Sequence, residues 1–404
     1  MTNIIIKFSC LFLLSLSVAT NLFANTNTIN EKERIAFESS LIEHSDRGRP
    51  DAEKWPIEKR LQHHGVPGAS VAIIKDHQVV WSSGYGVKQV GKPEMIDTDS
   101  VFSVGSVSKI ANAALILRLV VEGKVDLDTD VNTYLKSWKV ESNRYSRERK
   151  VTLRMILAHT AGFSQHGFGD FYPGEQLPNA LQTLNGEYPA KHGPVELMFT
   201  PGTEMDYSGG GTTVSQVLVE DVTGMKYEEA AQKFVFNPLG MTRSTFANPL
   251  PASHGNIAKA HDGDGNPTAL PRGYEAMPEM AASGLWTTAN DLAKLVIAFQ
   301  KSLQTDNGFI PKELAQDMMT RVNNSWHGLG PRINGEGQNK VFHHGGANNS
   351  YKAWIEGHLA TGTGIVVLTN GRNGHRLYSE IRKSAEDVFN WPVDVSTSFQ
   401  RPDF

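Results

Sequence analysis

Apolar and polar residues follow a strand-like pattern at both ends of the chain. Residues 66–74 and 79–86 are two β-rich runs on either side of the polar pair Asp76-His77, which predicts a β-hairpin. Three further β-rich stretches, separated by glycine and asparagine, lie near the other end and cover residues 340–344, 351–355 and 364–368. Both ends of the chain therefore contribute strands.

Between these ends the spacing of apolar residues is helical. Residues 106–121 are interrupted after their start only by Lys109, Asn112 and Arg118, and a Glu-Gly pair ends the pattern. A helix that is apolar almost all round belongs at the centre of a domain. Further helical patterns cover residues 153–158, 213–223, 227–236, 288–299 and 376–390. Asn290 is the expected N-cap of the pattern that begins near residue 288.

This order of elements predicts an α/β fold of the α+β type. One antiparallel sheet is flanked by helices and carries a mostly helical insertion. We expect residues 25–97 and 281–404 to form the sheet domain and residues 98–280 to form the helical domain. The active site is then expected in the cleft between the two domains.

The first 24 residues have the pattern of a cleaved signal peptide. Lys7 precedes a short apolar run at residues 10–19, and Ala24 offers a small residue for cleavage. The run is too short for a permanent span of a bilayer about 30 Å thick. Cys10, the only cysteine, lies inside this segment, so we expect no disulfide in the exported protein. If the source is Gram-negative, the expected location is the periplasm, with no membrane span after cleavage.

The charge of the chain narrows its partners. The chain has 404 residues, with 39 Lys and Arg against 43 Asp and Glu, a formal net charge of −4. A nucleic-acid binder would need clustered basic residues, so this class is excluded. Aromatic residues make up 9% of the chain, and their spread along its length excludes disorder. The expected partner is a small molecule or peptide substrate.

The strongest candidate for chemistry is the segment Ser106-Val107-Ser108-Lys109 at the start of the apolar helix. A serine and a lysine three residues apart lie on one face of a helix. A lysine among apolar side chains is costly to charge, so it can accept a proton. The helix dipole favours a developing alkoxide on Ser106. This arrangement is typical of a nucleophile beside a base, but a helix-capping serine followed by a surface lysine has the same spacing.

Two further segments combine a polar side chain with glycines. Tyr207 lies in a glycine-flanked loop, and a phenol beside an ammonium group can relay protons. His344 precedes Gly345 and Gly346 on a predicted strand, where glycines often mark close approach of a ligand to the backbone. Taken singly, the first segment also fits a core tyrosine at a turn, and the second fits a strand bulge with exposed histidines.

Together the three segments resemble the serine β-lactamase and penicillin-binding-protein superfamily. The resemblance is strongest to its class C-like branch, which includes class C β-lactamases, D-aminopeptidases, DD-peptidases and family VIII carboxylesterases. It covers nearly all of the exported chain. Further segments similar to the family are Val66-Pro67-Gly68, Leu157 to Gly162, Asn237 to Met241 and Ala282 to Ala289. The resemblance implies a β-lactamase/transpeptidase-like fold.

The resemblance also implies a role for each candidate residue. Ser106 would attack a carbonyl, Lys109 would accept the serine proton, and Tyr207 would protonate the leaving group. His344, Gly345 and Gly346 would bind substrate where the family has Lys-Thr-Gly. The oxyanion hole would consist of the backbone N–H groups of Ser106 and Ala347. No metal or organic cofactor is required.

Two departures from the family pattern bear on the substrate. Tyr207-Ser208-Gly209 lacks the asparagine of Tyr-x-Asn, and His344 replaces the usual lysine. Because imidazole is mostly neutral near pH 7, His344 would hold a substrate carboxylate less strongly. Both changes weaken the case for an efficient β-lactamase and fit peptidases, esterases or amidases.

Three hypotheses therefore stay open. The first is an exported serine hydrolase that cleaves small amides, D-amino-acid peptides or esters through an acyl-enzyme, with peptidoglycan-derived peptides among its substrates. The second is a class C-like β-lactamase that hydrolyses β-lactam antibiotics. The third, from a different class, is a non-catalytic cell-wall or antibiotic sensor, against which the intact Ser106, Lys109 and Tyr207 argue.

Overall fold

The computed structural model describes residues 28–172, 174–268 and 276–392. The predicted signal peptide, residues 1–24, lies outside the described residues, and so does Cys10. Within the described part, no helix has both the length and the apolar character needed to cross a membrane.

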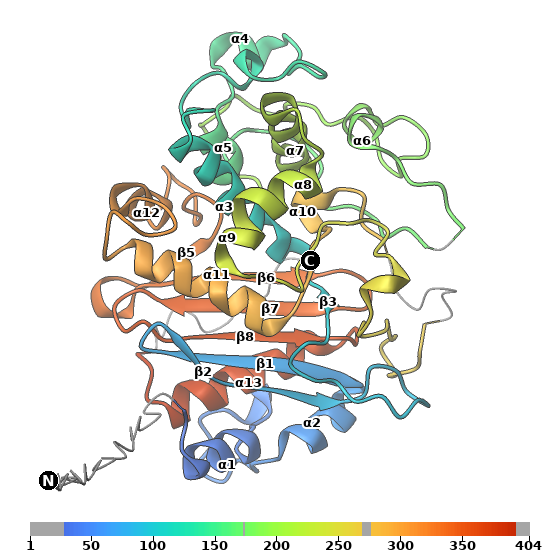
Figure 1. The fold of residues 1–404 in the computed structure, drawn as a ribbon, viewed down its shortest axis with the longest axis vertical. Coiled ribbons are helices and arrows are strands. Elements are labelled where there is room, and N and C mark those ends of the chain that lie inside the picture. Colours follow the sequence, from blue (N-terminus) through green and yellow to red (C-terminus); the bar gives the residue numbers. More distant parts are fainter. Residues whose placement is uncertain (1–27, 173, 269–275, 393–404) are drawn as a thin grey trace, which may run out of the picture.

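A six-stranded antiparallel sheet forms the middle of the molecule (Figure 1). Its strand order is β2-β1-β8-β7-β6-β5. The strands are β1 (Gly68–Lys75), β2 (Gln78–Gly86), β5 (Arg332–Asn334), β6 (Val341–Ala347), β7 (Lys352–His358) and β8 (Gly364–Thr369). Strand β1 from the first part of the chain pairs with β8 from the last part. The predicted fold class, with a sheet built from both ends of the chain, is confirmed.

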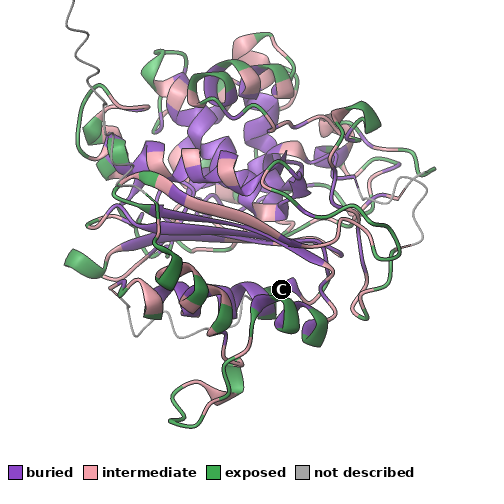
Figure 2. Cartoon of the chain, turned by 60° about the horizontal axis from the view of Figure 1, so that its bottom comes forward, coloured by how far each residue is buried: buried purple, intermediate pink, exposed green. Residues whose placement is uncertain are grey.

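Helices cover both faces of this sheet (Figures 1 and 2). On one face lie α1 (Glu31–Ser39), α2 (Ile57–His64) and α13 (Gly374–Val388), and on the other lies α11 (Ala289–Ser302). Strand β1 is buried from its start to Ile74 because it serves both layers. Ala72 and Ile74 belong to the core on the α11 side, whereas Val71 and Ile73 belong to the core under α13.

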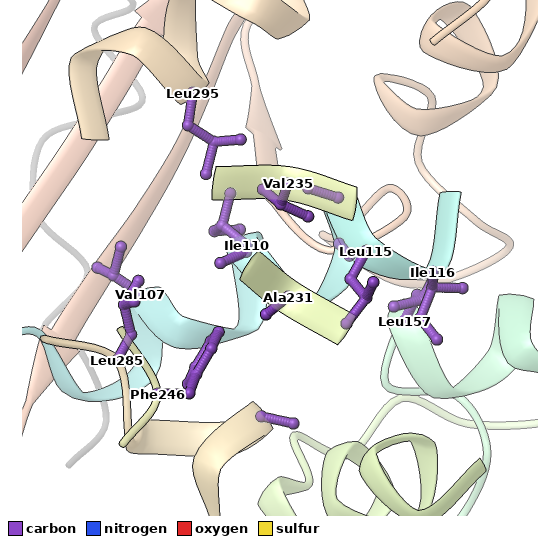
Figure 3. Close-up of a cluster of buried hydrophobic side chains, with 14 of the residues drawn as sticks. Val107, Ile110, Leu115, Ile116, Leu157, Ala231, Val235, Phe246, Leu285 and Leu295 are labelled. Carbon is purple, nitrogen blue, oxygen red and sulfur yellow. The ribbon is translucent and has the colours of Figure 1, made fainter. Parts of the chain in front are cut away.

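The remaining helices form the upper part of the molecule in Figure 1. Its centre is α3 (Ser108–Val121), and eleven of its residues are buried, as the apolar pattern predicted. Around α3 and beyond it lie α4 (Arg144–Glu148), α5 (Leu153–Leu157), α6 (Ala180–Asn185), α7 (Gly209–Thr223), α8 (Tyr227–Ala231), α9 (Asn237–Leu239), α10 (Met280–Ser283) and α12 (Lys312–Met318). Figure 3 shows Ile110 and Leu115 of α3 among side chains of neighbouring elements, such as Val235 and Leu157.

A small two-stranded sheet of β3 (Phe102–Ser103) and β4 (Trp286–Thr287) leads into the turn that contains Ser106. The exact boundaries of the two predicted domains stay a prediction.

Three local predictions are corrected by the structure. Ser106 lies in a single 3-10 turn, Gly105–Val107, and the α-helix begins only at Ser108. The N-cap of α11 is Thr288, whose side chain accepts the N–H of Asp291, and not Asn290. The glycines after Tyr207 form the first turn of α7 and are not loop residues, because the Ser208 side chain caps that helix.

Candidate active site

The structure brings Ser106 and Lys109 together at the base of the helical part. Lys109 Nζ lies 3.3 Å from Ser106 Oγ and donates a hydrogen bond of 2.9 Å to the backbone carbonyl of Ala282. The lysine is only 4% exposed. Ser108 holds the turn in place, because its hydroxyl donates to the carbonyl of Gly105 and accepts the N–H of Leu285. The 3-10 turn thus replaces the first helical turn and keeps the predicted pair adjacent.

Tyr207 lies directly beside this pair. Lys109 Nζ is 4.9 Å from the centroid of the Tyr207 ring. The phenol oxygen is buried and has no hydrogen-bond partner among the described residues. His159 positions the tyrosine, because its ring lies 4.2 Å from the Tyr207 ring and its Nδ1 accepts the N–H of Ser208 at 3.1 Å. The free phenol is therefore in place to exchange a proton with a bound ligand.

His344 reaches the site because neighbouring residues of strand β6 face opposite sides of the sheet. The ring of His343 stacks on Trp354 on the α13 side, whereas the ring of His344 lies 6.2 Å from that of Tyr207. His344 Nδ1 is 2.6 Å from the carbonyl of Gly345, a contact that requires a proton on Nδ1. Its Nε2 is then an acceptor, and this atom is buried without a partner among the described residues.

The imidazole of His344 is neutral. Burial is the main reason why its pKa lies well below the usual value, and the nearby His327, Arg332 and Lys109 lower it further. The lowered pKa agrees with the expectation that residue 344 carries no charge near pH 7.

Strand β6 and the Ser106 turn press against each other through glycines. A Cβ on Gly346 would lie 1.9 Å from the carbonyl oxygen of Val104, and one on Gly105 would lie 2.8 Å from the backbone nitrogen of Ala347. Larger residues at either position would force the two backbones apart. The glycines on strand β6 therefore allow the backbones of β6 and of the Ser106 turn to approach each other closely. They also remain a candidate ligand site.

The backbone N–H groups of Ser106 and Ala347 are both free to face a ligand. The N–H of Asn348 donates to the carbonyl of Tyr351, the residue just before β7, so in the antiparallel pattern the N–H of Ala347 points away from β7. On that side β5 pairs only with residues 341–343. The N–H of Ser106 lies in the first turn of a helix, where no intrahelical acceptor exists. Two such donors can hold a carbonyl oxygen that develops negative charge.

Sequence reasoning missed two residues of this site. His327 is fully buried, and its ring lies 5.9 Å from the rings of both Tyr207 and His344. The guanidinium of Arg332 lies 6.0 Å from the centroid of the Tyr207 ring. Neither residue belongs to a recognisable pattern in the sequence. Arg332 begins the edge strand β5, and His327 lies before that strand and forms a β-bridge with Arg332. His159, by contrast, falls in the segment Leu157 to Gly162, which carried part of the family resemblance.

Known proteins share this arrangement of elements. The family model for beta-lactamase matches residues 56–388, which is most of the chain. The chain belongs to the beta-lactamase family. Its members are typically serine hydrolases, which agrees with the serine and lysine found side by side.

The individual relatives match only about half of the chain, at moderate sequence identity. Penicillin-binding protein 4 of Amycolatopsis lactamdurans is 31% identical over 210 residues, 51% of each chain. Protein flp of Staphylococcus aureus is 28% identical over 190 residues, 47% of this chain and 37% of that protein. The chain thus spans about half or less of the length of these curated relatives.

Two solved structures show the same fold. The octameric penicillin-binding protein homologue from Pyrococcus abyssi has a TM-score of 0.67 and 23% identity, covering 83% of this chain and 76% of that one. D-amino acid amidase from Ochrobactrum anthropi has a TM-score of 0.65 and 17% identity, covering 82% and 98%. At this identity the likeness concerns the fold alone.

Proposed function

We propose that the protein is a serine hydrolase that cleaves small amides, D-amino-acid peptides or esters through a covalent acyl-enzyme. The observation that carries this proposal is the 3.3 Å separation of Lys109 Nζ and Ser106 Oγ next to two free backbone N–H groups. A base within reach of a serine hydroxyl activates it as a nucleophile. The family relationship supports the same chemistry.

The reaction follows from the positions of these groups. The amine of Lys109 takes the proton of Ser106 while Oγ forms a bond to the substrate carbonyl carbon. The N–H groups of Ser106 and Ala347 hold the resulting oxyanion. The Tyr207 hydroxyl donates its proton to the leaving nitrogen or oxygen as that bond breaks, and Lys109 returns a proton to the phenolate. Water then attacks the acyl-enzyme and releases the acid.

The charges around Tyr207 bear on which substrate fits. His344 is neutral, but Arg332 brings a permanent positive charge to the Tyr207 ring, close to His344 and His327. An arginine can pair with the carboxylate of a leaving group. A peptide that ends in a free carboxylate is therefore a reasonable substrate, even without the usual lysine.

β-Lactam hydrolysis is the second candidate, favoured by the same Arg332 and by the family model. Against it stands the missing asparagine of Tyr-x-Asn. In this chain the second partner of the lysine is the carbonyl of Ala282 instead of a side-chain amide. Residue 209 is glycine. This position therefore has no side-chain amide to bind the amide of the substrate.

The test is mass spectrometry of the purified protein with p-nitrophenyl esters, D-alanine peptides and nitrocefin. We expect turnover of an ester or D-amino-acid substrate and a transient acyl adduct on Ser106. Ser106→Ala should abolish both, whereas Ser253→Ala, a change at an exposed turn, should abolish neither. Unchanged turnover in Ser106→Ala would refute the proposal. A stable β-lactam adduct without any turnover would favour the sensor.

We also propose that residues 1–24 direct export to the periplasm. The support is the charged start, the short apolar run and the small residue at position 24. Mass spectrometry of protein recovered from a periplasmic extract should give an N-terminus at Asn25. An intact N-terminus, or recovery only with the cytoplasm, would contradict this.

A further inference from the structure

Residues 164–168, here called the strap, lie against the start of α7, directly after Tyr207. Ser208 and the first two residues of α7 donate hydrogen bonds to carbonyls of the strap, at 2.8, 3.0 and 3.0 Å: Ser208 to Ser164, Gly209 to His166 and Gly210 to Gln165. The first bond comes from a hydroxyl and the other two come from backbone N–H groups. These bonds fix the strap beside Tyr207, although the two lie far apart in the sequence.

The strap brings two aromatic side chains to the surroundings of Tyr207. The ring of His166 lies 4.9 Å from the Tyr207 ring, and His166 is exposed. The ring of Phe168 covers Gly209, because a Cβ on this glycine would lie 2.9 Å from Phe168 Cε2. The phenylalanine ring therefore occupies the space that a side chain at residue 209 would need.

The aromatic side chains continue away from the reactive groups. The ring of His192 lies 5.0 Å from that of Phe168, and both residues are partly exposed. At the other end, the Tyr207 ring lies 4.9 Å from Lys109 Nζ. We call Tyr207, His166, Phe168 and His192 the aromatic row. It begins beside the catalytic lysine and ends at residues that solvent reaches.

The position of Tyr207 decides which part of a substrate meets the aromatic row. In the proposed reaction the Tyr207 hydroxyl donates its proton to the leaving group, so the leaving group lies against this residue. His166 contacts the same tyrosine ring and is exposed. The distal part of a leaving group can therefore extend over His166 and Phe168. Aromatic rings whose centres are about 4.5–7 Å apart attract each other beyond the effect of the area that they bury.

We propose that the aromatic row is a subsite for a flat aromatic ring on the leaving group, with His166 and Phe168 as specificity-determining residues. This inference rests on the proposed hydrolase function and adds a preference on the leaving-group side. The strap belongs to none of the segments that resemble the family, so this preference comes from the contacts of this chain.

The test compares benzyl propionate with cyclohexylmethyl propionate at pH 7, by titration of the released acid. The two alcohols are similar in size, but only one has a flat aromatic ring. The ratio of their hydrolysis rates with hydroxide gives the baseline. We expect the wild type to favour the benzyl ester by about fivefold over this baseline in kcat/KM, mainly through a lower KM.

Four variants locate the preference. Phe168→Leu keeps an apolar side chain over Gly209 but removes the ring, and His166→Ala removes the ring against Tyr207. Each should bring the ratio of the two esters back toward the baseline, whereas Phe168→Tyr, which keeps a ring, should preserve the preference. Phe309→Leu is the matched control, because this partly buried phenylalanine contacts Arg118 and Phe299 outside the aromatic row. It should leave the ratio unchanged.

Two outcomes would overturn the inference. One is a wild type whose ratio equals the baseline. The other is a loss of kcat that is equal for both esters in Phe168→Leu and His166→Ala, which would show that the strap only positions Tyr207. The failure of the proposed function looks different, because the wild type would then form no acyl adduct on Ser106 with any ester or amide.

Discussion

Two buried polar clusters of this protein lie on opposite faces of the sheet and differ in how well they are satisfied. Under α13, Arg60 donates to both carboxylate oxygens of Glu380, and His64 lies 2.9 Å from the same carboxylate. In the site cluster, the phenol of Tyr207 and the Nε2 atoms of His327 and His344 have no partner among the described residues. Both clusters are buried, but only the first has its polar atoms paired.

This difference in hydrogen bonding distinguishes buried polar groups that stabilise the fold from buried polar groups that serve a ligand site. Burial alone would raise the pKa of Glu380, but hydrogen bonds from His64 and Arg60 outweigh it and lower the pKa. In the site, burial lowers the pKa of His327 to about 3, and the charges of Arg332 and Lys109 add to this effect. The paired cluster joins α2 to α13, whereas the site keeps its unpaired atoms for a ligand. Mutations should therefore act on stability in the first cluster and on activity in the second.

The largest expected effect is on catalysis. Lys109→Met should lower kcat/KM for an ester substrate by about 10⁴-fold, because it removes the base beside Ser106. Circular dichroism and the thermal midpoint should show a folded protein, since methionine fills the same buried space. A loss below tenfold in a folded variant would show that another group takes the serine proton.

The paired cluster should respond in the opposite way. Glu380→Gln removes the buried counter-ion of Arg60 and leaves it only the half-exposed Glu43 at 3.5 Å. We expect a loss of about 3 kcal/mol in the free energy of unfolding. Urea denaturation measures this loss, and kcat per folded molecule should stay within about twofold. Asp46→Asn, which breaks the exposed pair with Arg49, is the control and should cost less than about 1 kcal/mol. Equal losses in both variants would contradict the comparison.

Tyr207→Phe should separate stability from activity within the site. Removal of a hydroxyl that has no partner should not lower the free energy of unfolding, but it removes the proton donor to the leaving group. We expect kcat to fall by about 10²-fold for an amide, with a smaller loss for a p-nitrophenyl ester, whose leaving group needs no proton. Equal losses for both substrates would assign Tyr207 a positioning role.

The sequence predicted those parts of the molecule that depend on local pattern. The apolar run of α3, the hairpin of β1 and β2, and the spacing of Ser106 and Lys109 depend on neighbouring residues. His344 was assigned from the family resemblance, and strand alternation in the structure explains why it, and not His343, faces the site. Arg332 and His327 could not be found in this way, because only the tertiary fold brings them to Tyr207, which lies far away in the sequence. The cap of α11 was misplaced because Thr288 and Asn290 are both good caps, and only the observed bond to Asp291 decides between them.

The two clusters should also lose stability in different pH ranges. A histidine whose folded pKa lies below its unfolded value of 6.5 binds more protons when unfolded, so its contribution to stability is lost as the pH falls below about 6.5. For His327, with a folded pKa of about 3, this amounts to about 2 kcal/mol between pH 6.5 and pH 5. Glu380 has a lowered pKa, so its contribution is lost only as the pH falls below its unfolded value of 4.5.

His327→Gln should therefore flatten the loss of stability between pH 6.5 and pH 5 by about 2 kcal/mol, as measured by urea denaturation at the two pH values. His63→Gln, a change at a half-exposed ring, is the control. If the control flattens the curve as much, the acid sensitivity does not come from the unpaired imidazoles of the site. If neither variant changes the curve while Glu380→Gln does, the paired cluster is the part that yields first to acid, and the contrast between the two faces of the sheet is wrong.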